Sequence, residues 1–231
     1  MQRQRLAVRP PREGFTLVEL LVVVLIIGIL IAILMPVIAL VMRNVTATKS
    51  QQRVLNLANG TVAYYKDNGI YPGQAGWGKD RLNDQTATGL TGSQLLAKAL
   101  FSDIDGTGFP KSNYATYDTT TTLFTISSKP NTIGDCWPGN QVMAICYYPA
   151  RLGETGVGMF HGGPAQNADD NWAYTTGNIS GTFTFATAIQ AFPANGALPA
   201  TPYKANQFII IAPGPDRKYF NADDKNNFGG Q

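Results

Sequence analysis

Three carboxylates lie close together near the end of the 231-residue chain. Asp216, Asp223 and Asp224 fall within nine residues of one another, among glycine and asparagine residues that favour turns. Because Ca²⁺ takes about six to eight oxygen ligands, three carboxylates with backbone carbonyls and water could supply much of its shell. The spacing therefore allows a calcium site. The alternative is an acidic turn that water solvates.

Cysteine and histidine chemistry rests on three side chains. Cys136 and Cys146 are the only cysteines, and His161 is the only histidine. Two cysteines in an oxidising compartment permit a disulfide, which needs Cα atoms within about 7 Å, and two buried thiols are the alternative. A zinc site is short of ligands, and a Ser-His-Asp arrangement would depend on His161 alone. We find no catalytic constellation and expect no enzyme.

A single acid, Glu19, stands in a long apolar segment. It is the only charged residue from Phe15 to Met42. An all-helical segment of this length would measure about 42 Å, against about 30 Å for the hydrocarbon core of a bilayer, so residues 15–42 are predicted to form a transmembrane helix. A carboxylate at mid-bilayer costs about 2.5 to 3.5 kcal/mol. Glu19 therefore needs a shallow position or a partner, and we expect none within its own chain.

Residues 1–14 form a basic leader ahead of this segment. Of the 18 Lys and Arg and the 15 Asp and Glu in the chain, four Arg and one Glu lie in the leader, which leaves 14 of each elsewhere. The positive end should stay cytoplasmic. Nucleic-acid binding would need Lys and Arg clustered in the folded part, and the sequence has no such cluster, so we expect no nucleic-acid partner.

The sequence from Gly14, G-F-T-L-V-E-L-L-V-V, resembles the class III signal of type IV prepilins and type II secretion pseudopilins. The resemblance implies that a prepilin peptidase cuts between Gly14 and Phe15 and methylates the new amine on Phe15. It also implies that Glu19 neutralises the amine of a neighbouring subunit in a filament, a pairing that low dielectric strengthens. A signal anchor in which Gly14 and Glu19 are incidental is the alternative.

Pro36 lies inside the apolar segment and matches a proline of the pilin pattern. Its missing N–H and its ring should kink or loosen the helix. A tolerated transmembrane proline is the alternative reading.

The C-terminal acidic loop extends the resemblance. It is similar to the G-P-D-G…D-D loop of the major pseudopilin of the general secretion pathway, in which calcium is bound. Asp216 matches the aspartate of G-P-D, and Asp223 and Asp224 match the later acidic pair. Arg217 replaces the glycine, and it could pair with Asp216 and weaken metal binding. The segment Asp135-Cys136-Trp137 resembles the D-x-W of the same proteins.

Helical periodicity organises the first third of the chain. It predicts one helix from Leu17 to Lys66, with residues 15–42 in lipid and residues 43–66 as an amphipathic continuation. Asp67-Asn68-Gly69 should end it. Gly60 falls on the polar side of the continuation. The opposite, packed side is expected to hold Val54, Leu55, Leu57, Ala58, Thr61, Val62 and Tyr65.

Residues 67–231 are predicted to form one globular head. A short helix is expected at Gln94–Phe101, with Thr91 or Ser93 as its N-cap. Short runs rich in β-branched and aromatic residues predict strands at 122–127, 141–148, 182–189 and 207–212. Alternation in residues 182–189 predicts an antiparallel sheet with one wet face and one face on the helix. The expected fold class is α+β, and the resemblance implies a pilin-like fold.

These features predict a structural protein. We expect a subunit of a type II secretion pseudopilus, processed by prepilin peptidase and held in the inner membrane with its N-terminus cytoplasmic and its head periplasmic. Its expected partners are copies of itself, other pseudopilins and an inner-membrane assembly platform. A type IV pilin, or a minor pilin that binds a ligand, DNA or a secreted substrate, is one alternative. A signal-anchored periplasmic domain is another.

Overall fold

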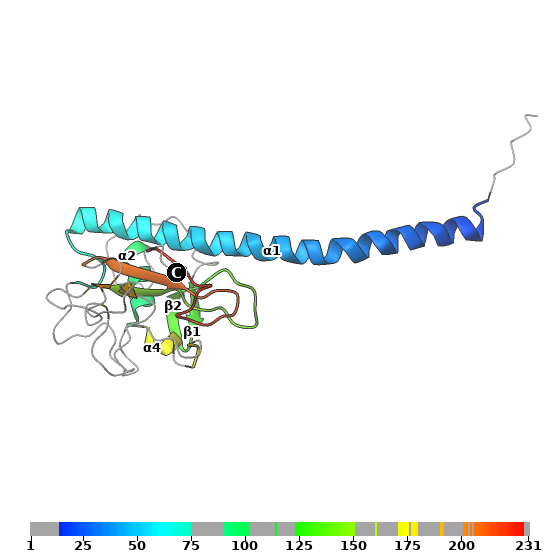
Figure 1. Ribbon diagram of the computed structural model, residues 1–231. Coiled ribbons are helices and arrows are strands. Elements are labelled where there is room, and N and C mark those ends of the chain that lie inside the picture. Colours follow the sequence, from blue (N-terminus) through cyan, green and yellow to red (C-terminus); the bar gives the residue numbers. More distant parts are fainter. Residues whose placement is uncertain are drawn as a thin grey trace, which may run out of the picture. The chain divides into compact units, whose positions relative to one another are not determined.

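A computed structural model describes most of the N-terminal helix and the framework of the head (Figure 1). The chain divides into two units, Met1–Asn44 and Val45–Gln231. The described residues are 14–74, 90–101, 114, 123–150, 160, 171–175, 177–179, 190–191, 201–202, 204 and 206–228.

The first helix, α1, spans Leu17–Asn68 and confirms the predicted long helix to within two residues at its end. Its sequence up to Met42 is almost entirely Leu, Ile, Val and Ala, and the helix continues through Pro36 without interruption. Gly69 follows it with a φ of +73° and donates its N–H to the Tyr65 carbonyl at 2.8 Å. A left-handed glycine of this kind is the usual helix terminator.

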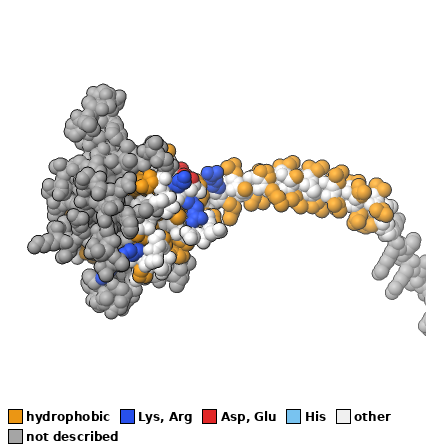
Figure 2. Space-filling view, turned by 90° about the horizontal axis from the view of Figure 1, so that it is seen from below, with side chains coloured by type: hydrophobic (Ala, Val, Ile, Leu, Met, Phe, Trp, Pro, Cys, Tyr) orange, Lys and Arg blue, Asp and Glu red, His pale blue; other side chains and the backbone are white. Residues whose placement is uncertain are grey.

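All side chains from Phe15 to Asn44 are exposed within the single chain. On the face seen in Figure 2, hydrophobic side chains predominate along this part of α1. The helix is long and apolar enough to cross a membrane by length and composition. A helix that is apolar on all sides is stable in water only if something covers it, so this part is suited to lipid or to other helices.

The part of α1 from Val45 onward buries a narrow line of small and apolar side chains. The buried residues are Ser50, Val54, Leu57, Gly60 and Thr61. The predicted packed side was too wide, because Leu55, Val62 and Tyr65 are about two-fifths exposed. The assignment of Gly60 to the polar side was also wrong. A Cβ at Gly60 would lie 2.8 Å from the Tyr114 carbonyl oxygen, so the absence of a side chain lets the backbone at Tyr114 approach the helix.

The second helix, α2, spans Gly92–Leu100 and confirms the predicted short helix, which starts two residues earlier than expected. Thr91 is its N-cap, and a reciprocal capping box joins Thr91 to Gln94. Gly92 lies where a Cβ would sit 1.9 Å from the Tyr147 carbonyl oxygen, so the helix start packs directly on a strand.

Short antiparallel strands form the sheets of the head. Strands β1 (Leu123–Ile126) and β2 (Lys129–Ile133) make a hairpin, and β3 (Cys146–Pro149), β6 (Phe208–Ala212) and β7 (Lys225–Asn226) make a three-stranded sheet in the order β3-β6-β7. A bridge between Gly134 and Ala144 connects the hairpin to β3. Strands β4 (Gln190–Ala191) and β5 (Thr201–Pro202) form a separate pair, and a short helix, α4, spans Trp172–Thr175.

Three of the predicted strands can be compared with this framework. β1 and β6 confirm the strands predicted at 122–127 and 207–212. The strand predicted at 141–148 is wrong at its start, because regular pairing with β6 begins at Cys146. Before that residue there is only an isolated bridge at Ala144, where Met143 and Ile145 exchange backbone hydrogen bonds with Asp135 and Ile133. The sequence reading missed β2 and β7. The predicted strand at 182–189 lies outside the described residues.

Both faces of the central strands are covered. On β6, Phe208, Ile210 and Ala212 belong to a core cluster with Val54 and Leu57 of α1. Ile209 and Ile211 point to the other side and join a second cluster, which includes Tyr148, Tyr174, Tyr219 and Phe220. The expectation of a sheet with one wet face is therefore wrong for this sheet, because α4 and the C-terminal loop cover the face that α1 leaves.

Candidate processing and assembly site

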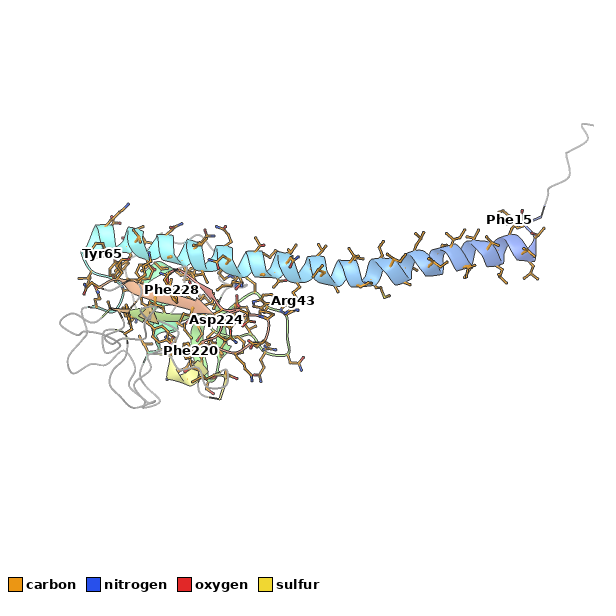
Figure 3. All side chains as sticks on the ribbon, viewed as in Figure 1. Phe15, Arg43, Tyr65, Phe220, Asp224 and Phe228 are labelled. Atoms are coloured by element: carbon orange, nitrogen blue, oxygen red, sulfur yellow. The ribbon has the colours of Figure 1, made fainter. Side chains whose placement is uncertain are left out.

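The Gly14–Phe15 peptide bond lies immediately before α1, where Figure 3 labels Phe15. The Phe15 side chain is 83 % exposed, and nothing lies within 4 Å of the position that a Cβ on Gly14 would take. A protease that cuts this bond needs an accessible, extended stretch of backbone. Among the described residues, nothing blocks that approach at Gly14.

Glu19 is held by Thr16, one turn before it. Glu19 Oε2 accepts hydrogen bonds at 2.8 Å from both the backbone N–H and the hydroxyl of Thr16, and the Glu19 N–H donates to Thr16 Oγ1 at 3.3 Å. This is a reciprocal capping box at the start of α1. The expectation that Glu19 has no partner within its own chain was wrong. The spacing T-x-x-E was the available signal, and the sequence reading missed it.

The capping box has a consequence for charge. Thr16 directly follows Phe15, so Glu19 is held next to the residue that would carry the amine after a cut at Gly14. A carboxylate in the first turn also faces the positive end of the helix dipole. The beginning of α1 thus presents a fixed acid beside the predicted cleavage point.

Residues 9–35 match the family model described as the prokaryotic N-terminal methylation motif. The chain is similar to type IV pilins in this N-terminal motif and in its pilin-like fold, a long N-terminal helix with small antiparallel sheets. The match includes Gly14, Phe15 and Glu19 and ends one residue before Pro36. No curated protein matches the chain, and no solved structure does. The match covers 27 of the 231 residues and concerns the N-terminal signal that type IV pilins and pseudopilins share.

The acidic C-terminal loop of the pilin-like protein is held by its own hydrogen bonds. Asp216 accepts from the Lys218 N–H and from the Asn221 side chain, both at 2.8 Å. Asp223 packs against Gly214, where a Cβ would lie 2.4 Å from its carboxylate. Asp216 is exposed, and its two oxygens already have donors within the loop.

Arg217 lies in the left-handed region with a φ of +62°, which explains why a glycine suits this position. Its guanidinium lies over Gly139 and donates to the Gln141 carbonyl. This contact ties the loop to the segment that follows Trp137.

Asp224 differs from the other two acids because it is buried. It lies beside Phe220 (Figure 3), whose N–H donates to Asp224 Oδ2 at 2.7 Å, while Oδ1 is buried without a hydrogen-bond partner. Burial raises the pKa of Asp224 to about 8. An unpaired buried oxygen is what a cation would satisfy. However, no group of three His, Cys, Asp or Glu side chains in the described part of the chain is arranged to hold a metal.

Cys136 and Cys146 are both free thiols in the structure. Cys146 starts β3 and is fully buried in the second core cluster, whereas Cys136 is only partly buried and follows Asp135. The two thiols have different surroundings, and the disulfide between them stays a prediction. His161 lies outside the described residues.

Asp135 is a residue whose role the sequence reading missed. Its Oδ1 accepts hydrogen bonds at 2.7 Å from the Ser50 hydroxyl of α1 and from the Cys136 N–H. Arg53, one turn further along α1, donates to the Gly134 carbonyl at 2.6 Å. These contacts fasten the helix to the loop after β2. Only the D-x-W resemblance pointed to this segment, and it gave no role to the acid.

Proposed function

We propose that this protein is a filament subunit that prepilin peptidase cuts between Gly14 and Phe15 and methylates on Phe15. The N-terminal methylation motif at residues 9–35, followed by an apolar helix with one acid near its start, is the observation that carries the proposal. After the cut, α1 holds the protein in the inner membrane with its head on the periplasmic side.

Assembly follows from the charge at the start of α1. A new Phe15 amine is a cation in a segment that otherwise suits lipid, and Glu19 is the only acid available to balance it there. Removing both charges from water is costly unless they pair, and pairing is strong at low dielectric. Thr16 holds the carboxylate in place until the amine of a neighbouring subunit reaches it, so one contact fixes the register between adjacent helices.

The filament is a type II secretion pseudopilus, in which this subunit polymerises with copies of itself and with other pseudopilins at an inner-membrane platform. The G-P-D…D-D order of the C-terminal loop and the Asp135-Cys136-Trp137 segment support this choice over an adhesive type IV pilus. Both resemble segments of major pseudopilins.

The mass of the purified full-length protein tests the processing step. In cells with a prepilin peptidase, we expect loss of residues 1–14 and a methyl group on Phe15. In cells without the peptidase, and for a Gly14→Ile variant with the peptidase present, we expect an uncut, unmethylated chain. An identical uncut mass in all three samples would make the protein a signal-anchored domain, and the filament proposal would fail.

Calcium binding in the C-terminal loop is a further part of the proposal. The unpaired Oδ1 of Asp224 supports it, and binding would require Asp216 and Asp223 to exchange loop contacts for the ion. We expect calcium to raise the melting temperature of the full chain in lipid nanodiscs and EDTA to reverse the increase. Asp224→Asn should remove the response. An unchanged melt in EDTA would dispose of the site and leave the processing proposal intact.

A further inference from the structure

The head contains a cavity that neither the processing motif nor the assembly helix uses. It has a volume of about 470 Å³ and lies between β1 and the segment 140–144, with side chains from α4 and the C-terminal loop at its base. β1 and α4 lie near each other at the same end of the head in Figure 1. Pockets that bind small molecules usually measure about 300 to 1,000 Å³, so this cavity has a suitable size.

The base of the cavity is aromatic and fixed. The Tyr219 hydroxyl donates to the Ala144 carbonyl at 2.8 Å, and the Tyr174 hydroxyl lies 2.7 Å from the hydroxyls of both Thr91 and Thr132. Burial raises the pKa of Tyr174 to about 12 and that of Tyr219 well above its ordinary value, so both phenols stay neutral. Both side chains are buried, so they support the cavity from behind, and the partly exposed aromatic ring among its described lining residues is that of Phe124.

The described rim of the cavity is polar, and its side chains are available for hydrogen bonds. Thr125 and Ser127 on the β1 side, and Asn140 and Gln141 on the other, are exposed lining residues. Within the described part of the chain, none of these four side chains makes a hydrogen bond. Amides and hydroxyls both donate and accept, so the rim can satisfy groups of either kind.

The described part of the cavity wall carries no charged side chain. None of the described lining residues is ionisable apart from the two neutral tyrosines, and Arg217, which bonds the Gln141 backbone carbonyl, is not a lining residue. A phosphate or an ammonium ion would lose water without gaining a counter-charge. A wholly apolar ligand would instead leave the rim amides without partners.

We propose that this cavity binds a neutral carbohydrate of one or two sugar rings. The hydroxyl groups of such a ligand both donate and accept, as the rim requires, and the C–H face of a sugar ring packs on the partly exposed ring of Phe124. Binding of this kind goes beyond the filament role and does not depend on processing at Gly14.

Titration of the full-length protein with sugars tests the proposal. The protein is held in lipid nanodiscs, because alkyl glycoside detergents carry sugar headgroups that would compete. The probes are glucose, galactose, mannose, N-acetylglucosamine and their β1-4-linked disaccharides, measured by saturation-transfer NMR and calorimetry. We expect at least one neutral probe to bind, and glucose 6-phosphate and glucosamine to bind about ten-fold more weakly or not at all.

Variants of the rim residues test whether a sugar binds in this cavity. The double variant Asn140→Ala and Gln141→Ala removes two exposed rim amides and keeps the backbone carbonyl that Arg217 uses, so the head should keep its melting temperature. We expect its Kd for the bound probe to rise about ten-fold or more, and an Asn59→Ala control, which removes an exposed amide from α1, to leave Kd unchanged. Failure of every probe, equal binding of the charged sugars, or full affinity in the double variant would each overturn the proposal.

Discussion

The two parts of α1 have the same backbone conformation but different surroundings. From Phe15 to Asn44 every side chain is exposed within the single chain, and apolar residues occur on all sides of the helix. From Val45 to Asn68 a narrow buried line meets the head, and polar residues occupy much of the rest. One continuous helix therefore has an exposed apolar part and a part that packs on the head. The side chains of its first part are exposed within the single chain, and its second part is a component of the core.

The largest expected effect concerns the first part. Glu19→Ala should leave cleavage, methylation and membrane insertion intact, because Gly14 and the apolar segment are unchanged, but it should abolish filaments. The amine of a neighbouring subunit would then lie in a low-dielectric environment without a carboxylate. Electron microscopy and the amount of protein in the sheared fraction measure assembly. Normal filaments in Glu19→Ala would refute the assembly role.

The next largest expected effect is a loss of stability from a substitution in the second part of α1, residues 45–68. Leu57 is fully buried and Leu55 is 42 % exposed, although they lie two residues apart on α1. Leu57→Ala should lower the free energy of unfolding of the head by about 2 to 5 kcal/mol, because it leaves a cavity beneath the helix. Leu55→Ala is the matched control and should cost about 0.5 kcal/mol or less. Equal melting temperatures for the two variants would mean that α1 does not pack on the head as described.

Gly28 and Gly60 show the same difference between the two parts of α1. A Cβ at Gly60 would meet the Tyr114 carbonyl oxygen at 2.8 Å, whereas nothing lies within 4 Å of one at Gly28. Gly60→Ala should therefore destabilise the head by about 1 to 3 kcal/mol despite the better helix propensity of alanine. Gly28→Ala should leave the melting temperature of the head unchanged. A stabilised Gly60→Ala variant would contradict the close approach at Tyr114.

The smallest expected effect is a pH dependence of stability that comes from Asp135, which joins α1 to the loop after β2. Burial raises the pKa of Asp135 above its ordinary value of 3.8, while hydrogen bonds from Ser50 and the Cys136 N–H and the charges of Arg53 and Lys225 oppose the increase. Because the folded-state pKa is the higher one, this stabilising contribution is complete below pH 3.8 and is lost as the pH rises through the folded-state pKa.

Thermal melts of the full chain in nanodiscs across the acidic range check this sign. We expect the Asp135 contribution to fall with rising pH by about 1.4 kcal/mol for each unit of pKa difference. Asp135→Asn should remove that part of the slope. The same slope in the variant would assign the pH dependence to other groups.

Local signals predicted several elements because their causes are local. The apolar periodicity predicted α1, and the run at 207–212 predicted β6. Thr91 and Ser93 were the two candidate caps of α2, and Thr91 is the cap. Capping and periodicity depend on residues within about four positions of one another, so a sequence contains them directly.

Features that depend on distant contacts were missed. β2 contains Lys129-Pro130-Asn131, which has the composition of a turn, and it is a strand because β1 pairs with it. β7 has two residues and exists through its pairing with β6. The burial of both faces of β6 depends on where α4 and the C-terminal loop pack, and no local pattern states that.

The candidate site shows the same difference between features with local causes and features that depend on distant contacts. The sequence by itself determined the N-terminal methylation motif, the apolar helix and the place of Glu19, because each of them lies within one short contiguous segment. Only the tertiary structure decided that Asp224 is buried while Asp216 is exposed, and that Arg217 contacts Gln141. Those outcomes depend on which segments of the chain, far apart in sequence, come together when the head folds.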